Sequence, residues 1–269
     1  MSVASNKLAV PMLLVFLLAF VVRLYPLVWS PYPYNIDGFG ESKFAEDIFD
    51  THSLAIPPEA TYADSYIIYM PFFNSLLAMF SNLMCADPLI TAQVFAATIG
   101  ALSCALVFLL LHVITGSRRV AFLGGLFMAL MGTYVFCTTS VWKENLGMLS
   151  LVIVAAFFLE RHDIRFRVLL TLLLVILTFV HHHSAVMTYL FFSFATVAEG
   201  YISMKARDWS WHNYADIGTM LFVWPLAVLY YSGIDLPYYD FLTPDTGMYL
   251  MLAVSCAMAV LMTYFLSGR

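Results

Sequence analysis

The sequence is short of charge. Only 11% of its 269 residues are Asp, Glu, Lys or Arg, whereas 62% are hydrophobic, and the mean hydropathy is +0.86. A soluble globular domain carries about 25% charged residues, so this composition excludes an ordinary water-soluble domain. No basic patch is present that could neutralise phosphates, which excludes a nucleic-acid partner.

Cysteine and glycine motifs are also scarce. The four cysteines show no spacing typical of a metal or redox site, and a bridge between Cys85 and Cys137 is the one pairing left open. The sequence has no Gly-rich phosphate loop and no low-complexity tract. It therefore contains no motif for a nucleotide or for an organic cofactor.

What the sequence does contain is long apolar runs. Several reach the ~20 residues that a helix needs to cross a bilayer. Backbone groups in lipid must be hydrogen-bonded within the segment, and barrel strands would alternate polar and apolar residues instead. The first run, residues 8–28, is too long for a signal-peptide core, so we expect a retained helix. The fold class predicted is an all-α polytopic membrane protein.

The positive charges indicate a topology. Of nine apolar segments, 66–84 contains Pro71 and Asn74 and is best placed on the outer surface. We then expect about eight transmembrane helices in a single transmembrane domain, residues 1–269, in the plasma membrane with a cytoplasmic N-terminus. The loop at 30–88 is extracytoplasmic and carries amphipathic surface helices. This arrangement places nine of the 12 basic residues in the cytoplasm, namely Lys7, Arg118, Arg119, Arg161, Arg165, Arg167, Lys205, Arg207 and Arg269.

Twelve of the 17 acidic residues then fall on the outer side, several of them in "YNIDGFGESKFAEDIF". In a helix, Phe44, Ala45, Ile48 and Phe49 form one apolar face. Glu41 belongs to that face, and Asp37 lies one turn earlier on the same line. Two interpretations are open: Asp37 is a helix cap and Glu41 a solvated carboxylate, or both form a carboxylate site in which burial raises the pKa and creates a general base.

Further polar residues belong to the same outer side. Lys143 and Glu144 in "SVWKENLG" are either an interfacial charged turn or a cation for a lipid phosphate beside an acid. His181, His182 and His183 lack the i, i+4 spacing of a helical zinc pair. At least one of these imidazoles should face the bundle, where it can bind a phosphate or a hydroxyl.

Arg23 lies inside the outer end of the first span. It either extends to the interface or pairs with Asp37, Glu41 or an anionic lipid headgroup. The cytoplasmic stretches "RHDIRFR" and "MKARDWSWHNY" are expected to be anchoring loops without a polar cluster of their own.

Over residues 8–160 the sequence resembles GT-C fold glycosyltransferases, the superfamily of protein mannosyltransferases and oligosaccharyltransferases. The similarity is carried by "RLYPL", "NIDGFGESKFAEDI", "YMPFFNSLLAMFSNLMCADP", "TGSRR" and "TTSVWKEN". "HHHSAVMTY" is similar to segments of archaeal-type members. Gly38 stands where many members have a second acid directly after the first.

The resemblance implies an inverting transfer of a sugar from a polyprenyl-phosphate carrier to a protein or glycan acceptor on the extracytoplasmic face. It implies that Asp37 is the catalytic base or orients the acceptor, and that Glu41 and Glu144 tune Asp37 or hold a divalent cation, Mg or Mn. The residues expected to hold the lipid phosphate are Arg23, Lys143, His181, His182 and His183. The alternative is a non-catalytic subunit of a membrane complex, or a lipid or solute transporter. Few charges lie within the spans and no internal repeat is visible, and both observations disfavour ion-coupled transport.

Overall fold

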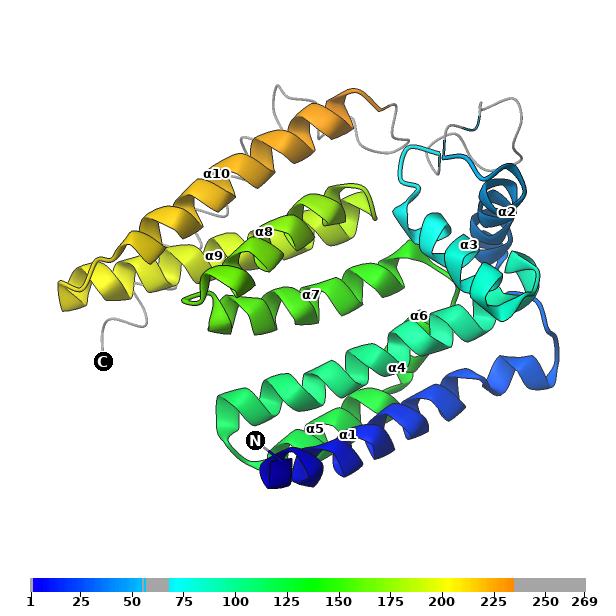
Figure 1. The fold of residues 1–269 in the computed structure, drawn as a ribbon, viewed down its shortest axis with the longest axis horizontal. Coiled ribbons are helices and arrows are strands. Elements are labelled where there is room, and N and C mark those ends of the chain that lie inside the picture. The colour runs from blue at the N-terminus through cyan, green and yellow to red at the C-terminus, as the bar shows by residue number, and fades with distance from the viewer. Residues whose placement is uncertain (1, 55, 57–67, 235–269) are drawn as a thin grey trace. The chain divides into compact units, whose positions relative to one another are not determined.

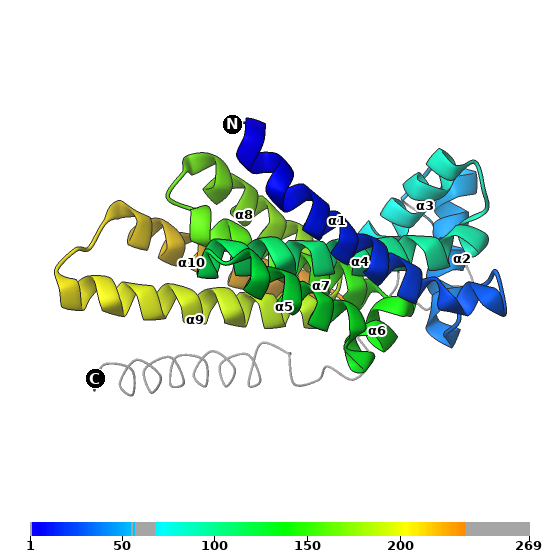
Figure 2. The ribbon, with the colours of Figure 1, turned by 90° about the horizontal axis from the view of Figure 1, so that it is seen from below.

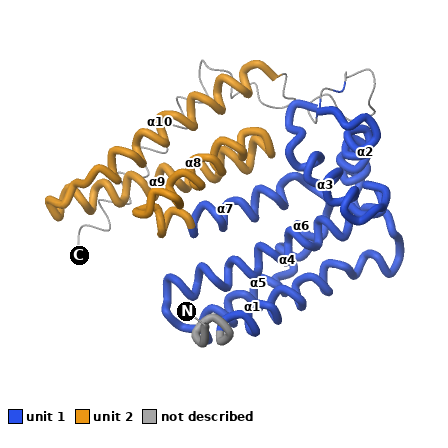
Figure 3. Tube along the Cα trace, in the orientation of Figure 1, with its two compact units in different colours: residues 1–156 blue, residues 157–269 orange. Residues whose placement is uncertain are grey.

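The computed structural model describes residues 2–54, 56 and 68–234 (Figure 1). Every regular element in these ranges is a helix, which confirms the all-α class. The chain divides into two compact units, residues 1–156 and 157–269 (Figure 3). The last of the nine apolar segments, residues 247–266, is also expected to span the membrane and lies outside the described residues.

Unit 1 contains three helices that pack side by side (Figure 2). They are α1 (Ser2–Arg23), α4 (Pro88–Thr115) and α5 (Arg118–Leu130). Small side chains at the contacts let helix backbones approach closely. The buried core between the three helices consists of Val15, Ala19, Ala101, Cys104, Phe108, Ala121 and Ala129.

A second layer of unit 1 is formed by α2 (Ile36–Thr51) and α3 (Phe72–Met84), which pack on each other and on α4. The short 3-10 helix η1 (Tyr25–Val28) leads from α1 toward this layer. Of the apolar face predicted for α2, Phe44, Ala45 and Ile48 are buried and Phe49 is half-buried. With 13 residues, α3 is shorter than the ~20 residues of a span.

Helix α5 is followed after one residue by α6 (Gly132–Thr139), and the two are bent by 62° at the break. Residues 140–142 then lead to α7 (Lys143–Glu160), which runs across the boundary between the units. Cys85 and Cys137 are free thiols, so the bridge between them is not formed.

Unit 2 continues with α8 (Ile164–Thr178), α9 (His182–Ala206) and α10 (Trp211–Ser232). The turn before α8 is stabilised by Asp163, which accepts a hydrogen bond from the amide of Arg165. A capping box of Ser210 and Asn213 begins α10. Each of the three helices packs on the other two.

Among the described residues, three helices are long and apolar enough to cross a membrane: α4, α9 and α10. The bent pair α5 and α6 makes a fourth if it forms one span. These helices indicate a membrane protein. The count of eight spans and the cytoplasmic N-terminus stay predictions.

Gly100 of α4 lies where Arg23 crosses the bundle. A Cβ atom at this position would lie 2.6 Å from Nε and 2.8 Å from Cδ of Arg23. We expect Gly100→Ala to lower the free energy of unfolding by about 1–3 kcal/mol, because overpacking forces neighbours to shift. Denaturant unfolding in detergent measures the change.

The matched control is Gly218→Ala in α10, where nothing lies within 4 Å of the added Cβ. Its free energy of unfolding should rise by up to about 1 kcal/mol, because alanine has a higher helix propensity than glycine. A Gly100→Ala protein as stable as wild type would show that the Arg23 side chain can repack.

Candidate functional site

A buried ion pair joins the predicted first outer loop to the second. Glu41 on α2 is 5% exposed and Lys143 at the start of α7 is 2% exposed. Lys143 Nζ lies 3.5 Å from Glu41 Oε1. Ionised side chains of this kind are almost never fully buried unless paired, so the pair requires the two segments to meet.

Asn74 of α3 fixes the other carboxylate oxygen of Glu41. Its Nδ2 donates to Glu41 Oε2 at 2.7 Å and to the main-chain carbonyl of Glu41 at 2.8 Å. Asn74 is fully buried. In the sequence, Asn74 indicated only that its segment lies at the surface, and its partner lies 33 residues away in the chain. The available signal was that Asn74 is one of two amide side chains in an apolar segment, the other being Asn82.

The segment 139–145 is held against α2 and α4 by side-chain amides. Val141 donates its amide hydrogen to Asn35 Oδ1 at 2.8 Å, and Gln93 donates to the Thr139 carbonyl at 2.6 Å. Gly38 permits the close approach, since a Cβ there would lie 3.0 Å from that of Val141 and 2.8 Å from that of Pro33. A second acid at position 38 therefore has no room in this structure.

Asp37 and Glu144 belong to the same cluster. Asp37 is exposed in the first turn of α2, and Glu144 is half-buried in the first turn of α7. Burial raises the pKa of Glu144, and the negative charges of Glu41 and Asp37 raise it further. The structure thus brings together all three predicted carboxylates and Lys143. It exposes Asp37, which the helical pattern had placed on the apolar line.

The pKa of Glu41 is raised, chiefly by burial, although Lys143 and Asn74 act in the opposite direction. An acid with a higher pKa in the folded chain binds more protons when folded. Its contribution to stability is therefore fully present below the ordinary value of 4.5 and is lost as pH rises through the folded-state pKa.

We expect thermal unfolding midpoints in detergent to fall as pH rises above 4.5, and Glu41→Gln to flatten this dependence. Each proton involved contributes up to about 1.4 kcal/mol per pH unit. Glu46→Gln, at a half-exposed position on the same helix, retains Glu41 and should keep the wild-type slope. An unchanged slope in Glu41→Gln would contradict the raised pKa.

Arg23 is fully buried within unit 1 and contacts uncharged groups. Among the described residues, neither the expected extension to the interface nor the expected ion pair with Asp37 or Glu41 is found. Its Nε donates to Thr138 Oγ1 at 2.6 Å, and NH1 donates to the carbonyls of Ala19 and Ala129 at 3.0 and 3.3 Å. Ala129 lies in the last turn of α5, where a cation favours the helix C-terminus. These contacts indicate that Arg23 stabilises the bend between α5 and α6. The role predicted for it at a lipid phosphate stays a prediction.

The three histidines lie at the start of α9 in unit 2. His181 and His182 are buried and His183 is exposed, with ring centroids 4.5–5.5 Å apart. His181 Nδ1 lies 3.1 Å from Ser184 Oγ. Their binding of a phosphate stays a prediction, and they belong to a different unit from Glu41 and Lys143.

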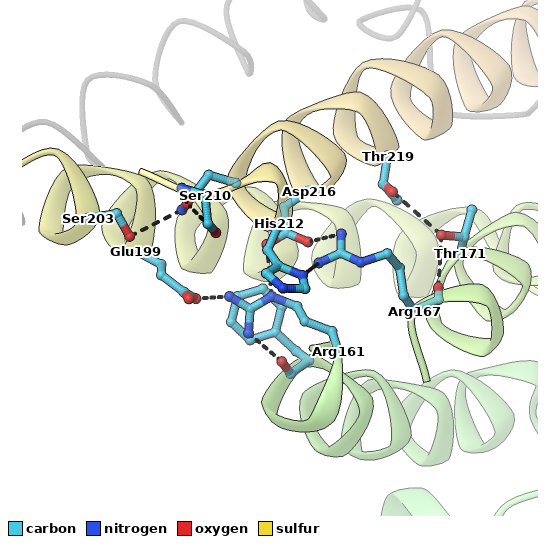
Figure 4. A network of polar contacts seen from close by, with 11 residues as sticks. Arg161, Arg167, Thr171, Glu199, Ser203, Ser210, His212, Asp216 and Thr219 are labelled. Atoms are coloured by element: carbon cyan, nitrogen blue, oxygen red, sulfur yellow. Dashed lines mark hydrogen bonds and ion pairs between the residues drawn. The ribbon is translucent and has the colours of Figure 1, made fainter. Parts of the chain in front are cut away.

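Unit 2 contains a polar network that no pattern in the sequence had predicted (Figure 4). Asp216 of α10 is 2% exposed and accepts from Arg161 Nε at 2.8 Å and from Arg167 NH1 at 2.7 Å. Arg161 also pairs with Glu199 of α9, and Arg167 NH2 lies 3.3 Å from His212 Nδ1. The expectation of plain anchoring loops is therefore wrong. The signal for Asp216 was an acid at the first position of an apolar run.

In the described ranges, no group of three or more His, Cys, Asp or Glu side chains has the arrangement of a metal site. A divalent cation beside Glu41 would in addition meet the charge of Lys143 at 3.5 Å. The residues present thus fit an ion pair better than a Mg²⁺ or Mn²⁺ site.

Comparison with protein-family models and with curated proteins finds no match to this chain.

Proposed function

We propose that the cluster of Asp37, Glu41, Lys143 and Glu144 is the acid site of a membrane glycosyltransferase. The enzyme would move a sugar from a polyprenyl-phosphate carrier to an acceptor on the extracytoplasmic face. The observation that carries this proposal is an exposed carboxylate, Asp37, next to a buried carboxylate–lysine pair and a second, half-buried acid. Perturbed carboxylates gathered in this way are typical of catalytic sites.

In the proposed reaction, Asp37 takes the proton from the acceptor nucleophile as the nucleophile attacks C1 of the sugar. The C1–oxygen bond to the carrier phosphate breaks, and the phosphate leaves with the electron pair, which inverts the configuration at C1. Lys143 offsets the negative charge of the buried Glu41 carboxylate. Asn74 holds the same carboxylate in place by a hydrogen bond.

The test uses the full chain purified with native lipid and a mixture of radiolabelled polyprenyl-phosphate sugars. We expect loss of sugar from the carrier and its appearance in an acceptor. Carrier binding without turnover would favour the alternative, a non-catalytic subunit of a membrane complex. Absence of carrier binding would contradict the glycosyltransferase proposal.

A further inference from the structure

His212, in the first turn of α10, makes a hydrogen bond that determines its protonation state (Figure 4). Its Nδ1 atom lies 3.3 Å from NH2 of Arg167 on α8. A guanidinium group has donors only, so Nδ1 must be the acceptor of this bond. An imidazole nitrogen accepts only when it carries no proton, and in protonated histidine both nitrogens are donors. The bond therefore requires neutral His212 with its single proton on Nε2.

Arg167 depends on this acceptor. Its side chain is 6% exposed, and its NH1 donates to Asp216 at 2.7 Å. Its Nε is buried and has no hydrogen-bond partner in the described part of the chain. A buried donor without an acceptor is costly. Loss of the bond to His212 would therefore leave a second nitrogen of the same guanidinium group unsatisfied.

The charges around His212 balance when its imidazole is neutral. The charged and titratable groups that face it are Arg161 and His162 in the turn after α7, Arg167 on α8, Asp216 on α10 and, paired with Arg161, Glu199 on α9. Two arginines here meet two carboxylates, so a proton on His212 gives the network a net positive charge. The ring of His162, with its centroid 4.7 Å away, adds a further charge when it is protonated.

The imidazole is accessible although the arginines are not. His212 is half-buried, and its ring contacts Trp211, which is 54% exposed. Histidine is the side chain whose ordinary pKa, about 6.5, lies within the physiological range, whereas arginine stays charged throughout it. A change of pH near neutrality therefore acts on the imidazole and not on the guanidinium group.

We propose that His212 and Arg167 form a pH-sensitive latch, which holds the start of α10 against α8 while His212 is neutral. A proton at Nδ1 removes the acceptor of Arg167 and places two positive charges 3.3 Å apart. The first turns of α10 then separate from α8 more often. This inference goes beyond the proposed function, because the latch lies within unit 2 and does not involve the acid cluster of unit 1.

The test is hydrogen exchange of the full chain in detergent at pH 7.5 and 5.5, measured by mass spectrometry and expressed as protection relative to the intrinsic exchange rate at each pH. The amides to follow are those of residues 215–219, which donate within α10. We expect their protection to fall about 2- to 10-fold at pH 5.5, the effect of one hydrogen bond. Peptides of α4 in unit 1 should show no such fall.

Two variants remove the titrating group. His212→Asn offers an amide oxygen near the position of Nδ1 and should keep the high protection at both pH values. His212→Lys carries a positive charge at both and should show the low protection at both. The matched control is His162→Asn, which removes the neighbouring imidazole, retains the bond to Arg167 and should respond to pH as the wild type does.

The loss of the pH response in both His212 variants is the decisive result, whichever level of protection each of them shows. A constant protection in wild type, or a response that persists in either His212 variant, would overturn the proposal. A response abolished by His162→Asn would also overturn it and assign the proton to His162. Protection of α4 that falls together with that of α10 would show general unfolding in acid instead of a latch.

Discussion

Asp37→Asn should fold as the wild type does and lose sugar transfer by about 10²- to 10⁴-fold, which is the contribution of a positioned general base. Asn keeps the size of Asp and cannot take the acceptor's proton. Asp37 is exposed in the first turn of α2, so its loss removes at most about 1 kcal/mol of favourable interaction with the helix N-terminus.

The control is Asp50→Asn, the same substitution at an exposed position on the same helix. It should retain the wild-type rate. Turnover of the radiolabelled carrier measures both variants, with the unfolding midpoint as the check on folding. A rate in Asp37→Asn within about threefold of wild type, below the 10²-fold minimum for a base, would remove Asp37 from the mechanism.

Asp216→Asn should destabilise the chain by about 3–5 kcal/mol, because it leaves two buried guanidinium groups without their shared counter-ion. Asp216 accepts from both Arg161 and Arg167, and all three side chains are less than 9% exposed. Removing one partner of a buried ion pair lowers the free energy of unfolding more than replacing both partners does, because it leaves a buried charge without a counter-ion. Denaturant unfolding in detergent measures the change.

Asp208→Asn, at an exposed position between α9 and α10, should change stability by less than about 0.5 kcal/mol. Replacing Arg161, Arg167 and Asp216 together by apolar residues should cost less than Asp216→Asn alone, because no buried charge of the three then remains. If Asp216→Asn lowered the free energy of unfolding by less than about 1 kcal/mol, which is the contribution of a solvated ion pair, water would be shown to screen the network.

The central part of the apolar face of α2 was predicted correctly from the sequence. The spacing of Phe44, Ala45 and Ile48 placed Glu41 on the apolar face, and Glu41 is buried. The composition likewise predicted helices long and apolar enough for a membrane, which α4, α9 and α10 are. These properties follow from the 3.6-residue period and from the local cost of unpaired backbone groups in lipid.

Contacts between helices were decided only by the tertiary structure. The pairing of Glu41 with Lys143, the bond from Asn74 and the exposure of Asp37 depend on how far each helix is rotated and shifted against its neighbours. The two bonds to Asp216 span 49 and 55 residues. Hydrophobic periodicity indicates which face of a helix is buried. It does not indicate which polar side chain of another helix contacts that face, because the contact depends on packing between side chains far apart in the chain.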